Sequence, residues 1–488
     1  MSRRGKDSSY AGMIAQTKRI DDVNTVMNRP GWEVIATICS AIMIIVALVL
    51  TVVYHNVAEA IIVVFVGTYV LISTEKINRT AMSLLGVAIA GVILFVAFEI
   101  GVPGGTDFAG LIEQIDWTTI IFIIAMSIIV SVAAASGLFQ YIALRIAARS
   151  HGDHRQLFIT FLVFVSGISL FFDTTSTMLI AGPLTIEICK ALEIDFKPFL
   201  VSEAIVCNFS SIPSIVGAVP NLVIAGQTGL NVGFLFVVFM PLSIILFLVS
   251  LPILLRWYSS TFGVTEEHRV DAVFSIDPTT MIKDRWDFNI SVAAIVMLVI
   301  GFAIGPAFGV VPSMIALIIA GFLLLLAHER ANEFLNRIGW PTVFFLVGLF
   351  GLVGALSITG IIDAIGDGIG SIIGNDPAFA TVFLTWIPAM LSAFLDNLPV
   401  SAVLAPIAEN LAVLSPVIPL ALVFAVNIGG YIFTPLGSPA NMVAIGLSEA
   451  EHDPIAFMDF VKIGTILGFI HLAIGTGYLL LINLLLGL

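Results

Sequence analysis

Long apolar runs alternate with short polar connections along almost the whole chain. The uninterrupted runs lie at about 33–54, 57–74, 81–101, 117–135, 233–255, 288–305, 311–328, 340–357 and 460–487. Each is close to the roughly 20 apolar residues that a helix needs to cross a lipid bilayer. The pattern therefore predicts an all-α membrane protein that crosses the bilayer many times.

Four further apolar stretches are interrupted by polar or helix-breaking residues. Residues 158–192 and 379–413 carry Asp173 and Asp396 near their centres, and we expect each to be a re-entrant hairpin. Residues 199–225 and 417–445 contain clusters of Asn, Gly and Pro, and each predicts a broken helix. Segments 138–154 and 361–375 are expected to lie in the membrane interface. This reading gives about eleven transmembrane helices.

Composition and charge support this arrangement. The chain is 59% hydrophobic and 11% charged, whereas a soluble domain has about 25% charged residues. With eleven crossings all 20 Lys and Arg residues fall on the cytoplasmic side, as the positive-inside rule requires. We expect a multi-pass plasma-membrane protein, in contact with the lipid bilayer. It would have a cytoplasmic tail (residues 1–31), a cytoplasmic linker (256–287) and an extracytoplasmic C-terminus. Nothing indicates a nucleic-acid partner.

The two halves, residues 32–255 and 288–488, share landmarks at a nearly constant spacing. Pairs 223 residues apart are Trp117 and Trp340, Asp173 and Asp396, and Pro183 and Pro406; pairs 220 apart are Gly217 and Gly437, and Asn221 and Asn441. The charge distribution starts the first repeat outside and the second inside, which predicts inverted-topology repeats. Such repeats are typical of secondary transporters, whose sites lie at the membrane midplane. Accidental similarity of apolar sequence is the alternative.

The candidate site is the place where two hairpin tips and two helix breaks converge. An ionisable residue inside a membrane is costly and indicates function by default, so we expect Asp173 and Asp396 to couple proton exchange to transport. The alternative is that each aspartate only caps the returning helix. Unpaired carbonyls at the breaks suit Na⁺, which predicts sites at Asn208/Gly217 and Asn427/Gly437. The predicted binding residues are Asp173, Thr174, Thr175, Asn208, Gly217, Asn221, Asp396, Asn397, Asn427, Gly437, Ser438 and Asn441.

Other polar residues in apolar sequence are weaker candidates. Glu203 is either a buried relay or a charge near a helix start, and His471 is interpreted as a hydrogen-bonded packing residue. Glu187 and Glu409 are expected at the interface, and Cys207 is a single thiol that could meet a soft metalloid. No Walker motif, zinc spacing or nucleophile elbow is present, so the sequence does not support an enzyme or ATP-driven pump. No cofactor is expected besides H⁺ or Na⁺ as coupling ions.

Several of these motifs resemble the ion transporter superfamily. They are Phe172-Asp173-Thr174-Thr175-Ser176-Thr177, Phe394-Leu395-Asp396-Asn397-Leu398-Pro399, and Asn427-Ile428-Gly429-Gly430 with Thr434-Pro435-Leu436-Gly437-Ser438. The chain is most similar to the branch of arsenite-efflux proteins (ArsB), sodium/proton antiporters (NhaD) and the melanosomal P protein. The resemblance implies a scaffold domain, a mobile transport domain, elevator-like movement and often a homodimer.

The sequence departs from this superfamily at two places. Divalent-anion relatives place Ser-Asn-Thr at both hairpin tips, where this chain has Asp173 and Asp396. The first break reads Phe209-Ser210-Ser211 where relatives usually have Ile-Gly-Gly. The leading hypothesis is a proton-coupled antiporter that exports arsenite or a similar small oxyacid. A Na⁺/H⁺ antiporter and a Na⁺-coupled importer of a carboxylate or inorganic anion are the alternatives.

Overall fold

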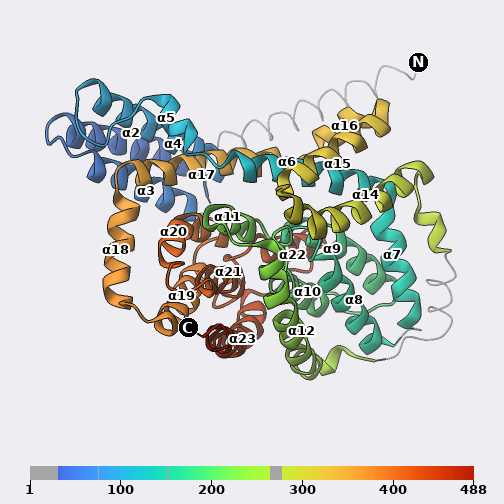
Figure 1. Cartoon of the computed structure of the whole chain (residues 1–488). Helices are drawn as coiled ribbons and strands as arrows, with labels where there is room; N and C mark the ends of the chain where they lie inside the picture. The colour runs from blue at the N-terminus through green and yellow to red at the C-terminus, as the bar shows by residue number, and fades with distance from the viewer. Residues whose placement is uncertain (1–30, 75, 151–152, 264–276, 488) are drawn as a thin grey trace, which may run out of the picture. The chain divides into compact units, whose positions relative to one another are not determined.

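The described part of the protein is built from helices. The computed structural model describes residues 31–74, 76–150, 153–263 and 277–487, and every regular element in those ranges is a helix (Figure 1). Seven of the described helices are long and apolar enough to span a bilayer, and five further apolar helices are shorter. The prediction of an all-α polytopic membrane protein is therefore confirmed, while the number of crossings stays a prediction. Most of the predicted tail, and residues 264–276 of the predicted linker, lie outside the described residues.

The chain divides into two compact units, Met1–Ile112 and Glu113–Leu488. In the first unit α3 (Val57–Ser73) packs against both α2 (Gly31–Val52) and α4 (Arg79–Glu99). Asn56 and Asn78 cap α3 and α4, because each side chain accepts a hydrogen bond from a backbone N–H that has no partner within the first turn. The three spans predicted for this region are thus present with nearly the expected bounds.

One group of helices in the second unit surrounds α6 (Trp117–Ser136). Among the helices that pack on it are α14 (Arg285–Ile304), α15 (Pro312–Ala327) and α17 (Trp340–Ile358). The group begins and ends at residues predicted from the apolar pattern, to within a few positions. All four helices are rich in apolar residues.

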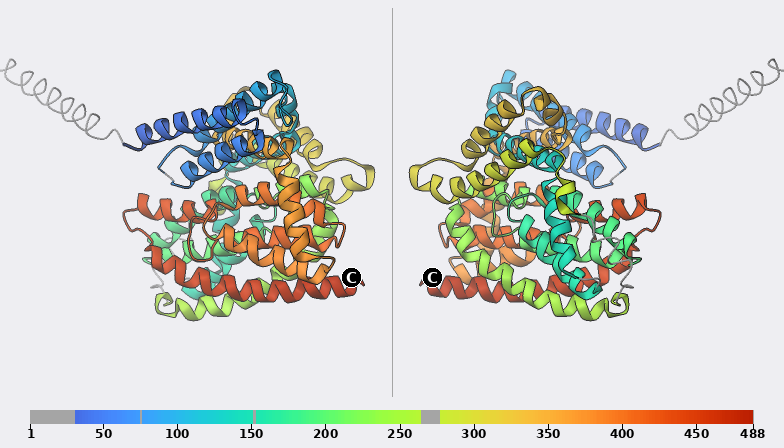
Figure 2. Two further views of the ribbon diagram at one scale, coloured as in Figure 1. Left: turned by 90° about the vertical axis from the view of Figure 1, so that its left-hand side faces the viewer. Right: turned by 90° about the vertical axis from the view of Figure 1, so that its right-hand side faces the viewer.

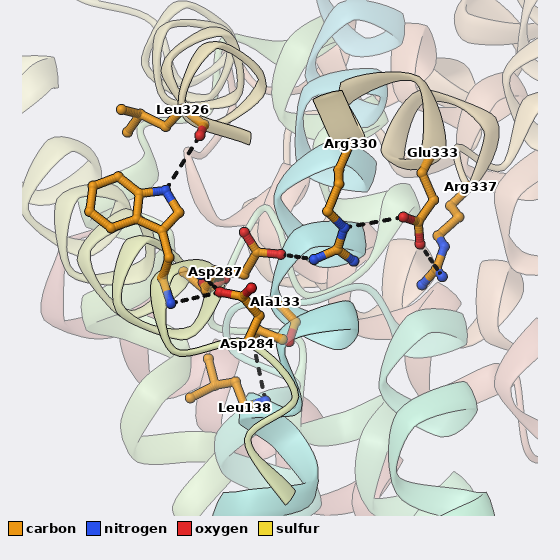
Figure 3. A network of polar contacts seen from close by, with 11 residues as sticks. Ala133, Leu138, Asp284, Asp287, Leu326, Arg330, Glu333 and Arg337 are labelled. Carbon is orange, nitrogen blue, oxygen red and sulfur yellow. Dashed lines mark hydrogen bonds and ion pairs between the residues drawn. The ribbon is translucent and has the colours of Figure 1, made fainter. Parts of the chain in front are cut away.

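An ionic network joins the start of α14 to the segment after α15 (Figure 3). Arg330 pairs with the buried carboxylate of Asp287, and its Nε lies 3.2 Å from Glu333 Oε2. Glu333 Oε1 in turn accepts from Arg337 at 2.6 Å. The hydrogen bond from Arg330 lowers the pKa of the Glu333 carboxyl, which stays ionised. Because Asp287 is buried, removing Arg330 would leave an uncompensated charge there.

Two short helices follow glycine turns at equivalent places. α7 (Leu138–Ala147) follows Gly137, with φ of 84°, and α18 (Ile361–Ile373) follows Gly360, with φ of 74°. This left-handed backbone suits glycine, which has no Cβ to clash. Both segments were expected from sequence as separate from the spans before them. Their place in the membrane interface stays a prediction.

The interruptions that the sequence predicts are present in the structure. The hairpin helices are α8 (His154–Ile168) with α9 (Thr174–Ala191), and α19 (Pro377–Ser392) with α20 (Asn397–Leu411). The broken helices are α10 (Lys197–Ser210) with α11 (Val219–Thr228), and α21 (Val417–Gly429) with α22 (Pro439–Ala450). A proline in the first turn restarts each broken helix, where its missing N–H costs nothing. That the hairpins are re-entrant stays a prediction.

The segments of the two predicted repeats pack against one another in the second unit. α11 packs on α20, and α22 packs on α9, so the second part of each broken helix contacts the returning hairpin helix of the other repeat. α10 is buried from Pro198 onward and α21 is buried throughout, which places the first part of each broken helix in the core (Figure 1). Two long helices, α12 (Val232–Trp257) and α23 (Phe457–Leu485), run beside each other (Figure 2). The inverted orientation of the repeats stays a prediction.

Candidate transport site

The two hairpin aspartates are helix caps. Asp173 Oδ1 accepts from the backbone N–H groups of Thr175 and Ser176 at 3.0 and 3.1 Å, and its Oδ2 accepts from Ser176 Oγ at 2.5 Å. Asp396 Oδ1 accepts from the N–H of Leu398 at 3.0 Å. Both side chains are half-buried. The structure thus supports the capping role that the sequence left as an alternative. Capping keeps each charge in place at a hairpin tip and is compatible with ion binding.

The second hairpin tip is hydrogen-bonded to the second break. The N–H of Asn397 donates to the carbonyl of Gly437 at 3.0 Å, and Thr434 Oγ1 donates to the carbonyl of Ala393 at 2.7 Å. Phe433, in the same break, has a left-handed φ of 59°, a strained conformation for a bulky residue. Its N–H donates to Thr465 Oγ1 of α23 at 3.0 Å. The second break is therefore held by bonds to two different elements.

The first hairpin contacts the first break through side chains. Ser166 Oγ of α8 donates to Ser210 Oγ of α10 at 2.8 Å, and Cys207 Sγ donates to the carbonyl of Thr174 at 3.5 Å. The Cys207 thiol is fully buried in this contact, which suits a small packing side chain rather than an exposed metal ligand. Thr174 is buried, and Thr175 contributes its N–H to the cap of Asp173.

A glycine in each break allows the hairpin backbone to approach closely. A Cβ on Gly217 would clash with the carbonyl oxygen of Ser169, and a Cβ on Gly437 would clash with that of Ser392. The two serines are themselves 223 residues apart, so the contacts are equivalent. The sequence named both glycines as site residues, and the structure shows that each lets a hairpin carbonyl approach closely.

Four buried asparagines join the two breaks to each other. Asn208 Nδ2 donates to Asn441 Oδ1 at 3.1 Å, and Asn427 Nδ2 donates to Asn221 Oδ1 at 2.6 Å. In each pair, one asparagine precedes the break of one repeat and its partner follows the break of the other. All four side chains are fully buried. The pairing is reciprocal, so one hydrogen-bonded unit, here called the asparagine quartet, links the repeats.

The two asparagines that follow the breaks also satisfy the broken backbone. Asn221 Nδ2 donates to the carbonyls of Ser211 and Ser214 at 3.1 and 2.8 Å. Asn441 Nδ2 donates to the carbonyls of Gly430 and Pro435 at 2.7 and 3.1 Å. Carbonyls that lose helical partners must find others at membrane depth. These two side chains therefore explain how both breaks remain buried.

Three buried polar atoms of the breaks have no hydrogen-bond partner. They are Asn208 Oδ1, Asn427 Oδ1 and Ser438 Oγ. Buried polar atoms are rarely left unpaired, and oxygen atoms of amides and hydroxyls are suitable ligands for Na⁺ or acceptors for a hydroxylated solute. The first two atoms occupy equivalent positions, next to the two Na⁺ sites predicted from sequence. These unpaired oxygen atoms could therefore bind a cation or accept hydrogen bonds from a solute.

The charge of the site is negative. The hairpin tips (169–177 and 392–399) and the breaks (208–221 and 427–441) contain two carboxylates and no Lys, Arg or His. Among the described residues, no group of three or more His, Cys, Asp and Glu side chains is placed to hold a metal. The oxygens available are those of amides, hydroxyls, backbone carbonyls and the two carboxylates.

A buried histidine holds the second break against α23 and α12. Ser250 Oγ donates to the carbonyl of Leu246 at 2.7 Å, so it accepts from His471 Nε2 at 2.8 Å. His471 Nδ1 is then the acceptor for the hydroxyl of Tyr431 at 2.7 Å. Both ring nitrogens are satisfied in the neutral form. The interpretation of His471 as a hydrogen-bonded packing residue is therefore confirmed.

Glu203 is buried rather than being a charge at a helix start. Its side chain is fully buried in α10, and Oε1 accepts from Thr185 Oγ1 of α9 at 2.6 Å. Glu187 and Glu409 are exposed, as expected for interfacial residues, and Glu409 accepts from Gln227. Of the acidic residues weighed from sequence, Glu203 alone is enclosed by the helix core.

Sequence analysis found the asparagines of the quartet but missed how they pair. The sequence assigned Asn208 and Asn427 to the two predicted Na⁺ sites and related Asn221 to Asn441 by spacing, whereas in the structure Asn208 bonds Asn441 and Asn427 bonds Asn221. The sequence identified these residues but not the partner of each. The contacts of Ser166 and Tyr431 carried no comparable signal, since isolated serines and tyrosines are common in membrane helices.

Comparisons with known proteins identify the family. A model described as "Citrate transporter" (CitMHS) matches residues 69–426. The chain belongs to this transporter family. It is 30% identical over 423 residues to an uncharacterized transporter of Mycobacterium tuberculosis, which covers 85% of this chain and 96% of that protein. A 46 kDa membrane protein of Mycobacterium leprae is 28% identical over 424 residues, covering 86% and 97%.

The human P protein is a more distant relative of this CitMHS member. It is 25% identical over 507 residues, which cover 87% of this chain and 60% of the P protein. The match to the P protein confirms the branch of the ion transporter superfamily that the hairpin and break motifs indicated. Together with the apolar helices, these relatives establish a multi-pass membrane transporter.

Proposed function

We propose that this CitMHS member is a secondary active antiporter that uses the proton gradient to export arsenite or a similar small oxyacid. The observation that supports this most is the charge of the site, which has two carboxylates and no basic side chain. A divalent anion would be repelled there. Neutral As(OH)₃ can instead donate its hydroxyl hydrogens to carboxylates and to the unpaired oxygens of Asn208 and Asn427.

Alternating access is the proposed mechanism. The asparagine quartet joins the two breaks, and each hairpin is hydrogen-bonded to the broken helix of its own repeat, which suits a site that moves as a body between two faces of the membrane. The resemblance to the superfamily supports elevator-like movement against a scaffold, and a homodimer. It also supports a plasma-membrane location with the N-terminus inside and the C-terminus outside.

A Na⁺/H⁺ antiporter is the second candidate, favoured by a specific observation. Asn208 Oδ1 and Asn427 Oδ1 are equivalent, buried and unpaired, and neutral carbonyl oxygens near a carboxylate are good Na⁺ ligands. The family description names citrate, which makes a carboxylate the third candidate. Carboxylate transport is the least favoured candidate, because the four site segments contain no basic side chain that could bind an anion.

Transport by the purified protein in liposomes separates these candidates. The liposomes contain a pH-sensitive dye, and arsenite, NaCl or citrate is added outside in separate experiments at a fixed membrane potential. Proton flux that requires arsenite supports the first proposal, and flux triggered by Na⁺ alone supports the second. Accumulation of citrate without either effect would overturn both. Protein-free liposomes measure leakage.

A further inference from the structure

One carboxyl oxygen in the core has no explanation in the site described above. Glu203 Oε1 is bonded to Thr185, but Glu203 Oε2 is buried and has no hydrogen-bond partner. Ionised carboxylates in apolar surroundings require several donors or a nearby cation, because burial removes their hydration. A single neutral hydroxyl does not provide this. The surroundings therefore accommodate the neutral, protonated acid.

The helices that pack on α10 bring no buried cation to Glu203. These helices are α8, α9, α12, α21 and α22. Two thiols, Cys189 of α9 and Cys207 of α10, are also buried. The remaining titratable or charged groups on these helices and α10 lie at helix ends or are exposed: His154, Arg155, Asp173, Glu187, Lys190, Lys197, Arg256 and Glu449. α21 has no titratable side chain.

The second repeat has no counterpart of the hydrogen-bonded pair Glu203 and Thr185. Leu422 lies 219 positions after Glu203, and Ala408 lies 223 positions after Thr185. Both of these residues are apolar and buried. The asparagines, glycines and capping aspartates of the site all occur twice, whereas the buried acid occurs once. A packing role would be met by leucine, as it is in the second repeat. The difference therefore indicates a task performed once per chain.

Glu203 is also close to the site without being part of it. It precedes Asn208 by five residues on the same helix, which is a rise of about 7.5 Å. Over distances of this order in a protein interior, a charge on Glu203 would act on an ion held at the first break. Loss of the proton would create a negative charge near the first break and favour a cation there, so proton release and cation binding would be linked.

We propose that Glu203 is the proton-carrying group of the transport cycle, with Thr185 as the residue that positions its carboxyl. This inference rests on the proton coupling of the proposed function and assigns it to one residue. The proton binds to the Glu203 carboxylate from water on one side and leaves to water on the other, and no other bond changes. The hairpin aspartates then serve as caps and fixed charges.

Infrared spectroscopy of the purified protein tests this without any cargo. We expect a carbonyl-stretch band of a protonated carboxylic acid at neutral pH, which Glu203→Gln removes and Glu187→Gln, an exposed matched control, retains. Thr185→Val should shift the band, because the carbonyl loses its hydrogen bond. Absence of the band, or its survival in Glu203→Gln, would overturn the assignment. If Glu203→Gln does not fold, the Thr185→Val shift decides, and an unshifted band counts against the proposal.

Proton-driven transport in liposomes then tests the carrier role. With whichever of arsenite or Na⁺ the wild-type protein transports, we expect Glu203→Gln to lose at least tenfold in proton-coupled flux, while Glu187→Gln stays within twofold. Retained pH-dependent flux in Glu203→Gln would overturn the carrier role even if the infrared band is lost. A wild-type protein that moves neither probe contradicts the proposed function instead, because the infrared result does not depend on cargo.

Discussion

The two helix breaks of this protein have the same plan but are held differently. Both have an asparagine before and after the break and a glycine against a hairpin carbonyl. The second break is held by Asn397, Thr434 and the Tyr431–His471 bond. The first contacts its hairpin through serine and cysteine side chains and has Glu203 on the preceding helix. The shared parts form the candidate binding site, and the differences place the proposed proton exchange in the first repeat.

The largest loss of transport is expected from substitutions at the two glycines, where the two breaks are most alike. Gly217→Ala and Gly437→Ala each place a Cβ against a backbone carbonyl of a hairpin, which cannot move as a flexible side chain would. Overpacking of this kind costs about 1–3 kcal/mol and displaces the hairpin tip. We expect both variants to lose transport by about 100-fold in the liposome assay.

Gly446→Ala is the matched control, because a Cβ there has no neighbour within 4 Å. It should transport as the wild type does. If Gly217→Ala were active while Gly437→Ala was not, the first break would tolerate movement that the second does not. Full activity in both variants would contradict the close approach as a requirement.

The next test separates charge from capping at the hairpin tips. Asparagine caps helices about as well as aspartate, so Asp173→Asn and Asp396→Asn should fold with a change in unfolding free energy below about 0.5 kcal/mol. Removal of a site charge should reduce transport by at least about tenfold. Thermal unfolding in detergent and flux in liposomes measure the two effects. Asp173→Ala and Asp396→Ala should also lose about 1 kcal/mol of stability.

If either asparagine variant transports with wild-type rate and pH dependence, its aspartate is only a cap. Asp376, which caps α19 and is exposed, provides the control. Asp376→Asn should change neither stability nor flux. A transport loss at one tip alone would show that the two repeats share the cap but not the charge requirement.

The fold was largely predictable because membrane helices are recorded in the sequence as apolar runs. Interruptions such as Asp173 and Asp396 stand out against that background, and their bounds were predicted to within a few residues. The short helices α5 (Phe108–Glu113) and α16 (Ala331–Asn336) were missed, since a polar loop and a one-turn helix have similar composition. The contacts that depend on three-dimensional crossing, such as Asn208 with Asn441, could not be assigned from spacing alone.

Substitutions in the asparagine quartet are expected to have an effect of intermediate size, which is measured as a loss of stability. Asn208→Ala and Asn441→Ala each remove one member of a buried hydrogen bond, at a cost of about 1–3 kcal/mol. Because the pair is in contact, the double variant should cost about 1 kcal/mol less than the sum. Thermal unfolding of the wild type, the two single variants and the double variant gives this coupling energy. Asn483 bonds Ser415 instead of a member of the quartet. The stability losses of Asn208→Ala and Asn483→Ala should therefore add, and this pair serves as the control.

The same cycle at Asn427 and Asn221 compares the two crossed pairs. Their bond is shorter, 2.6 Å against 3.1 Å, so an equal or larger coupling is expected. A coupling near zero in either pair would mean that its asparagines are independent of each other. Reciprocal pairing would then not be what joins the repeats.

The smallest effect is expected from Tyr431→Phe, which removes only the hydroxyl that donates to His471 Nδ1. The ring keeps its packing, and one unpaired nitrogen costs about 1 kcal/mol. Thermal unfolding should show this loss, while Tyr54→Phe, at an exposed position, should show none. Flux should fall less than about threefold, because the break is also held by Asn397 and Thr434. A loss of proton coupling at unchanged stability would instead make Tyr431 and His471 a proton path in the second repeat, and would contradict the assignment of proton exchange to Glu203.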